Sequence, residues 1–128
     1  MLAAYGDRME GRSRAEAMLG SIQELMTRYP TAFAQWLCAA DFALGPVQEI
    51  AVLGEAGDPQ TAALLHTLWK RYRPRQVMAV SAYPPASGSP ALLKDRPLKD
   101  GRPTAYVCQG FVCQQPVNSP EELEAQLG

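Results

Sequence analysis

The chain has 128 residues, of which 47% are hydrophobic and 20% charged, and its formal net charge is -1. This length and composition fit one globular domain that buries about two-thirds of its unfolded surface and folds without metals or disulfide bonds. The near-neutral charge excludes a general attraction to nucleic acid or to anionic membranes. The first residues lack a signal-peptide pattern, and no apolar run approaches the ~20 residues of a membrane span, so we expect a cytoplasmic protein without a membrane partner.

An amphipathic pattern opens the chain. Between Ala15 and Tyr29, apolar residues recur every three or four positions, which places them on one stripe of a helix. Ser13 followed by Glu16 is typical of a capping box at the start of that helix, and Pro30 ends it. The pattern therefore predicts a helix that begins at Ser13.

A second amphipathic helix is predicted between Pro30 and Gly45-Pro46. Its apolar stripe comprises Phe33, Trp36, Leu37, Ala40, Ala43 and Leu44. Together the two segments predict an antiparallel helical hairpin over residues 13–45.

The pattern then changes to strand, helix and strand. Residues 50–53 form a continuous apolar run, which is typical of a strand buried on both faces. Asp58 and Pro59 provide an N-cap and a first-turn proline for the next helix. The apolar stripe predicted for that helix comprises Ala62, Leu65, Leu68, Trp69 and Tyr72. Residues 77–80 form a second buried strand, so residues 48–82 predict a parallel pair with a right-handed crossover.

The last third of the chain predicts a long loop, a hairpin and a short helix. Proline-rich residues 83–101 form the loop, with a short turn at 91–93, and the hairpin turns near Gln109-Gly110. The caps and core residues expected for the C-terminal helix are Ser119, Pro120, Glu122, Leu123 and Leu127.

The predicted fold class is α/β. A helical hairpin comes first, and an α/β subdomain over residues 47–128 follows, with a β-α-β crossover, a long loop, a β-hairpin and a C-terminal helix. We expect both parts to belong to a single domain of residues 1–128.

Cys108 and Cys113 form the candidate thiol pair. Three cysteines are too few for a secreted disulfide framework, so reduced thiols are the starting expectation. Four residues lie between the two cysteines, not the two of a thioredoxin-type redox motif, and no helix begins between them. A loop at Gln109-Gly110 sets Cys108 opposite Phe111, whereas a four-residue loop sets the two cysteines opposite each other, within the ~4.4 to 6.8 Å that a disulfide spans. We favour two small packed hydrophobic side chains, with a reversible disulfide as the alternative.

No other segment carries a convincing chemical site. His66 is the chain's one histidine and is predicted on a helix in the other half of the chain from Cys108 and Cys113, so we do not expect a closed zinc site. We expect His66 on the surface or partly buried without a catalytic role. Residues 54–58 follow a strand, but the glycine spacing is wrong and the acidic residues there repel phosphate, so they predict a turn and a helix cap. We therefore expect no catalytic residue, no cofactor and no metal.

The densest basic cluster comprises Lys70, Arg71, Arg73 and Arg75, with Trp69 and Tyr72 interleaved. Such a mixture can stack on bases. Cations at a helix C-terminus are also favoured by the macrodipole, and we assign the aromatic side chains to the core stripe, so we expect no nucleic-acid partner.

Several segments resemble one protein family. The tail carries Tyr106-Val107-Cys108, Cys113, Pro116 and Ser119-Pro120-Glu121-Glu122-Leu123. Upstream matches are Tyr29-Pro30 with Phe33, the run Gln48-Glu49-Ile50-Ala51-Val52-Leu53-Gly54, and Arg73-Pro74. On the strength of these motifs, the chain resembles the C-terminal region of the spermatogenesis-associated thioredoxin-domain proteins and their bacterial relatives. The resemblance covers most of residues 14–127.

The resemblance implies a place in a larger architecture. Full-length members of that family have a thioredoxin-like domain and a helical toroid similar to the sugar 2-epimerases, followed by a region like this one. The resemblance implies that the helical hairpin corresponds to the last toroid helices and residues 47–128 to an appended subdomain. It carries over no active-site residue, because this chain has no Cys-x-x-Cys and too few helices for a toroid.

Three functions follow as hypotheses. We favour a non-catalytic structural or interaction subdomain that packs against the remainder of a larger parent protein or forms a homodimer. Its candidate interface residues are Phe33, Trp36, Leu37 and Leu44. The alternatives are a thiol redox accessory that uses Cys108 and Cys113, and a small-ligand site near residues 54–58 and 81–83, where the parallel strands end.

Overall fold

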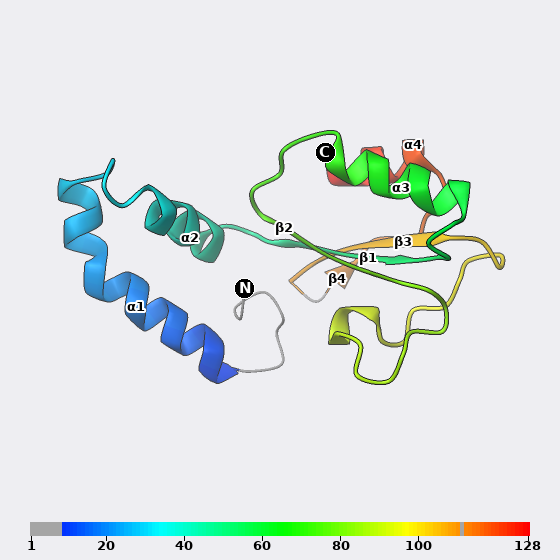
Figure 1. Cartoon of the computed structure of the whole chain (residues 1–128), viewed down its shortest axis with the longest axis horizontal. Coiled ribbons are helices and arrows are strands. Elements are labelled where there is room, and N and C mark those ends of the chain that lie inside the picture. The colour runs from blue at the N-terminus through cyan, green and yellow to red at the C-terminus, as the bar shows by residue number, and fades with distance from the viewer. Residues whose placement is uncertain (1–8, 111) are drawn as a thin grey trace. The chain divides into compact units, whose positions relative to one another are not determined.

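A computed structural model describes residues 9–110 and 112–128 of the chain (Figure 1). The chain divides into two compact units, Met1–Pro46 and Val47–Gly128. The fold class is α/β as predicted, because the described residues form α-helices and a mixed four-stranded sheet.

The first unit contains helices α1 (Met9–Arg28) and α2 (Ala34–Leu44), which contact each other. The predicted capping box at the start of the first helix is wrong, because α1 begins before Ser13. Glu16 instead forms an ion pair with Arg12, with 2.8 Å between Nε and Oε1. This pair spans one helical turn and stabilises an extension that the sequence pattern did not indicate.

The second unit is built on the sheet order β2-β1-β3-β4. Strand β1 (Gln48–Leu53) pairs in parallel with β2 (Gln76–Ser81) and antiparallel with β3 (Thr104–Gln109). The predicted parallel pair is therefore confirmed. The prediction that both strands are buried is correct for β1 and wrong for β2, whose Val80 is exposed because β2 lies at the edge of the sheet.

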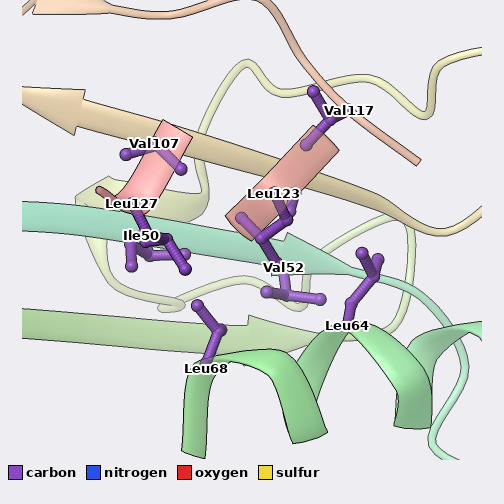
Figure 2. Close-up of a cluster of buried hydrophobic side chains, with 9 residues drawn as sticks. Ile50, Val52, Leu64, Leu68, Val107, Val117, Leu123 and Leu127 are labelled. Carbon is purple, nitrogen blue, oxygen red and sulfur yellow. The ribbon is translucent and has the colours of Figure 1, made fainter. Parts of the chain in front are cut away.

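Helices α3 (Pro59–Trp69) and α4 (Pro120–Leu127) cover one face of this sheet (Figure 1). Figure 2 shows the resulting core, in which side chains from β1, β3 and both helices meet. These buried residues include Ile50, Val52, Leu64, Leu68, Val107, Val117, Leu123 and Leu127. Alternate residues of β1 enter this core because strand side chains point to the two faces in turn.

The stripe predicted for the helix after Pro59 is only partly correct. Helix α3 buries Thr61, Leu64, Thr67 and Leu68, while Trp69 is 65% exposed and Tyr72, beyond the helix, is 89% exposed. Of the predicted stripe, Leu68 alone is buried, so the helix is rotated about its axis relative to the expected orientation.

The opposite face of the sheet is covered by the long loop. Ala51 and Leu53 of β1 pack there with Tyr106 and Cys108 of β3 and with Leu93 of η2 (Ala91–Leu93). The short turn predicted at 91–93 is therefore confirmed as a 3-10 turn. The loop is a structural layer rather than a free connection.

Polar side chains cap both helices of this unit as predicted. The Asp58 carboxylate accepts a hydrogen bond from the Gln60 amide at 2.7 Å, and Ser119 Oγ accepts one from the Glu122 amide at 3.2 Å. Each cap satisfies one of the amides left without a helical partner in the first turn.

A buried polar network joins the end of the loop to the C-terminal segment. The side-chain nitrogen Nδ2 of Asn118 donates hydrogen bonds to Pro103 O at 2.7 Å and to Thr104 Oγ1 at 3.0 Å. The Thr104 hydroxyl also accepts a hydrogen bond from the backbone amide of Lys99 at 2.9 Å and donates one to Arg102 O at 2.7 Å. Asn118 and Thr104 thereby fix the turn at residues 99–102.

Candidate functional site

The hairpin formed by β3 and β4 (Val112–Cys113) places the two cysteines directly opposite each other. Gln109 pairs with Val112, so the predicted turn at 109–110 is wrong by one residue, and Phe111 lies outside the described residues. The Gln114 amide donates to Val107 O at 2.9 Å, which makes the cysteine pair a non-hydrogen-bonded pair. Opposed Cα atoms approach most closely at such positions.

The sulfurs of Cys108 and Cys113 are bonded to each other. The starting expectation of reduced thiols therefore does not describe this pair, and the favoured interpretation as two separate hydrophobic side chains is replaced by a disulfide. The physical reason is the register, which sets the two cysteines directly opposite each other. Their Cα atoms are 3.9 Å apart, closer than the span expected from the sequence.

The two halves of the disulfide lie in different surroundings. Cys108 is 1% exposed and packs in the core under the loop, whereas Cys113 is exposed at the edge of the sheet. Cys113 is therefore the half of the disulfide that faces solvent, and Cys108 is the half that is covered.

Arg96 lies beside the exposed sulfur. Its Nη1 is 3.3 Å from Cys113 Sγ, and its Nε donates to Leu92 O at 2.6 Å. The guanidinium also lies over the ring of Tyr106, 5.1 Å from the ring centroid. Spacing did not reveal this cation, because Arg96 and Cys113 are 17 residues apart and the fold of the loop brings them together.

Tyr106 holds the same loop through its hydroxyl, which donates to Pro97 O. Burial raises the pKa of Tyr106, the charge of Arg96 lowers it, and Tyr83 raises it further, with a net increase. The phenol therefore remains a neutral donor near pH 7 and supports the position of Arg96.

The candidate interface residues of α2 are incompletely covered. Phe33 and Trp36 are partly buried, Leu37 is 39% exposed and Leu44 is 88% exposed. None of the residues of α2, all of which are described, is buried. A groove of about 320 Å³ between α1 and α2 is lined by Glu16, Leu19, Gly20, Gln23, Met26, Ala40, Ala43 and Leu44.

The expected turn at residues 54–58 contains a tightly packed glycine. A side chain added at Gly54 would collide with Thr61 and Pro103, and the Gly54 amide donates to Ser81 O at 3.0 Å. A cavity of about 500 Å³ in the second unit is lined by residues 83–89 and 93–97, and not by residues 54–58.

Basic residues after α3 converge on one carboxylate. Glu124 lies 3.1 Å from Lys70 Nζ, 3.5 Å from Arg71 Nε and 3.4 Å from Arg73 Nη2. The sequence-based assignment of Trp69 to the core is wrong, as its exposure shows. His66 is exposed.

The described residues contain neither a metal-binding cluster nor a membrane-spanning helix. Over residues 9–110 and 112–128, no group of three or more His, Cys, Asp or Glu side chains is arranged to hold a metal ion. Within those same ranges, none of the helices has both the length and the apolar character needed to cross a bilayer.

Comparison with known proteins finds one similar curated protein, human spermatogenesis-associated protein 20. The two are 29% identical over 114 residues, which cover 86% of this chain and 14% of the human protein. The chain thus spans about 14% of the length of that relative. No family model matches the chain, and no solved structure matches it.

Proposed function

We propose that this chain is a non-catalytic structural and interaction subdomain of a larger cytoplasmic protein similar to spermatogenesis-associated protein 20. The observation that carries the proposal is α2, a largely apolar helix of which no residue is buried. In this proposal α1 and α2 are the last helices of a helical toroid, and residues 47–128 are the subdomain attached to it.

The composition of α2 supports a contact role. Most helical stability in proteins comes from packing of the apolar face, so a helix as apolar as Ala34–Leu44 gains stability from a surface that covers it. Leu37 and Leu44 each contribute roughly 1.5 to 3 kcal/mol when a partner buries them completely, and less in proportion to the area already covered.

The second unit supports the same division of roles. Its sheet carries one buried cluster on the face of α3 and α4 and another under η2. Residues 47–128 thus have a core of their own, whereas α2 depends on a neighbour.

The partner we propose for α2 is an apolar helical surface within the same larger polypeptide. The match to the human relative covers only 14% of that protein, so a protein of this type has ample further chain to supply such helices. When the chain is studied alone, a second copy takes the place of that surface, and the apolar faces of two α2 helices pair.

Sedimentation velocity of the isolated chain over a wide concentration range tests this surface. We expect reversible dimer formation by the unaltered chain, which the double substitution Leu37→Gln and Leu44→Gln abolishes. Ala39→Gln is the matched control, because it adds an amide at an exposed position of α2 outside the predicted apolar stripe.

Circular dichroism confirms that each variant keeps its helix content before sedimentation. A chain that stays monomeric at all concentrations contradicts the proposed surface. If Ala39→Gln weakens dimer formation as much as the double substitution does, the proposed surface is also contradicted, because dimer formation then does not depend on the apolar stripe.

A further inference from the structure

The disulfide hairpin combines features of a reactive thiol and its partner. Cys113 is an exposed residue, while Cys108, directly opposite, is buried beneath the loop. Redox-sensing cysteines are typically accessible, ionised thiols placed next to a second cysteine that resolves the oxidised form. In the reduced hairpin, Cys113 and Cys108 meet the accessibility and spacing parts of this description.

Arg96 provides the third feature, a positive charge that favours ionisation of the Cys113 thiol. Its contacts with Leu92 O and with the Tyr106 ring do not involve either cysteine, so they hold the guanidinium in place whether or not the sulfurs are bonded. A cation 3.3 Å from Cys113 Sγ favours the thiolate, which is the nucleophilic form of cysteine.

We propose that Cys113 and Cys108 form a hydroperoxide-responsive redox switch, in which Cys113 is oxidised first, Cys108 resolves it, and Arg96 raises the share of Cys113 present as thiolate. This role does not depend on the contacts of α2. Disulfides in cytosolic proteins are mostly transient and of the catalytic or redox-sensing kind, which agrees with a reversible bond at the sheet edge.

The chemistry proceeds in two steps. The Cys113 thiolate attacks the O–O bond of the hydroperoxide, so that an S–O bond forms, the O–O bond breaks, and two electrons pass from sulfur to the peroxide. The products are a sulfenic acid at Cys113 and an alkoxide or hydroxide that takes a proton from water. The Cys108 sulfur then attacks the sulfenic sulfur, forming the S–S bond and releasing the hydroxyl group, with the thiol proton, as water.

The element that the switch controls is β4. This strand has only two residues, both exposed, and the disulfide joins it covalently to β3. In the reduced chain β4 is held by the few backbone hydrogen bonds of the hairpin, including that from the Gln114 amide to Val107 O. Reduction therefore loosens this edge and leaves the core beneath it in place.

The order of oxidation is tested on the full chain carrying Cys108→Ser. The reduced protein is treated with hydrogen peroxide in the presence of dimedone, which traps sulfenic acid, and the modified cysteine is identified by mass spectrometry. We expect the adduct on Cys113, formed faster than on Cys38, the exposed free cysteine that serves as an internal reference. An adduct that forms first on Cys38, or none on Cys113, overturns the proposal.

The role of Arg96 is tested by the rate at which the reduced unaltered chain forms its disulfide. A one-unit fall in a thiol pKa raises the thiolate fraction near pH 7 roughly eightfold and lowers its nucleophilicity roughly threefold. We therefore expect Arg96→Gln to slow oxidation roughly threefold, Arg96→Lys to retain most of the rate, and Arg102→Gln to leave it unchanged. Arg102 is the matched control because its guanidinium lies near Asp100, at 3.7 Å.

Circular dichroism before treatment shows that the Arg96 variants are folded. Equal rates for the unaltered chain, Arg96→Gln and Arg102→Gln overturn the assignment of Arg96. Slowing by both Arg96→Gln and Arg96→Lys also contradicts it, because a charge effect is then absent.

Discussion

Gly54 lies where the end of β1 meets α3 and the segment before β3. A Cβ atom at this position would collide with Thr61 Oγ1 and would lie 2.9 Å from Pro103 Cβ. Three parts of the second unit therefore approach one another at a residue without a side chain. The glycine therefore serves close packing.

We predict that Gly54→Ala lowers the free energy of unfolding by about 1 to 3 kcal/mol, because the added methyl group forces buried neighbours apart. Urea denaturation measures the change. Gly57→Ala is the control, since no heavy atom lies within 4 Å of a Cβ built there. Equal losses in both variants would show that crowding at Gly54 is not the cause.

Glu124 is the acidic residue on which the basic residues after α3 converge. The hydrogen bond from Lys70 lowers the pKa of this carboxyl, desolvation raises it, and the charges of Lys70, Arg71 and Arg73 lower it further, with a net decrease. A carboxyl whose pKa is lower in the folded state stabilises the fold above its unfolded value and loses that contribution as the pH falls through its folded value.

We predict that Glu124→Gln destabilises the chain near neutral pH and that its difference from the unaltered chain vanishes in acid. The difference should be constant above the ordinary pKa of 4.5 and decline below it. Denaturant unfolding over a series of pH values measures this profile. Added salt should reduce the effect because the carboxylate is partly open to solvent. A difference that is independent of pH contradicts the ion-pair origin.

At the scale of elements, the β-α-β unit and its caps could be predicted from local signals. The apolar run of β1, the Asp58 cap and the Ser119 cap each act within a few residues, so their patterns are visible in the sequence. The edge position of β2 could not be predicted. It follows from β3, which is distant in the chain and pairs with the other side of β1.

The predicted apolar stripe of α3 differs from its buried face, because the stripe omits two threonines that are buried and includes two aromatic residues that are exposed. Thr61 and Thr67 are almost completely buried against the sheet, while Trp69 remains exposed at the end of the helix. Burial in α3 therefore follows which side of the helix a residue occupies, even where a threonine is buried and a tryptophan is exposed.

The candidate site was predicted only in part. The cysteine pair can be identified from the sequence, which leaves its register open between two hairpin loops; the structure has the register that sets the two cysteines opposite each other. Gly110, with φ of +56°, occupies a turn position that favours glycine. The position of Arg96 beside Cys113 cannot be predicted from the sequence, because the two residues are 17 positions apart and only the folded loop brings them together.

Asn118 links two elements, and its loss should weaken both. We predict that Asn118→Ala lowers the free energy of unfolding by about 1 to 3 kcal/mol, since Pro103 O and Thr104 Oγ1 lose a buried donor. Gln114→Ala is the control, because its exposed amide makes a single side-chain hydrogen bond of 3.3 Å to Gln126 O. Thermal and urea unfolding would both show the contrast, and a loss no larger than that of the control would contradict it.

At the scale of the whole molecule, the two units differ in how well each covers its own apolar surface. Residues 47–128 enclose both faces of their sheet, whereas α2 buries none of its residues. For this reason we propose that the first unit binds another apolar surface, whereas the second unit has a complete core of its own. Sequence periodicity predicted the apolar stripe of α2 but not how little of it the chain covers.

The size of the natural polypeptide is the most direct test of whether this chain is part of a larger protein. An antibody raised against residues 47–128 can be used on a denaturing immunoblot of cells that express the protein. We expect a band far larger than a 128-residue polypeptide, because we propose that the subdomain is part of a longer chain. A band only at the size of 128 residues, in lysates protected from proteolysis, would contradict it.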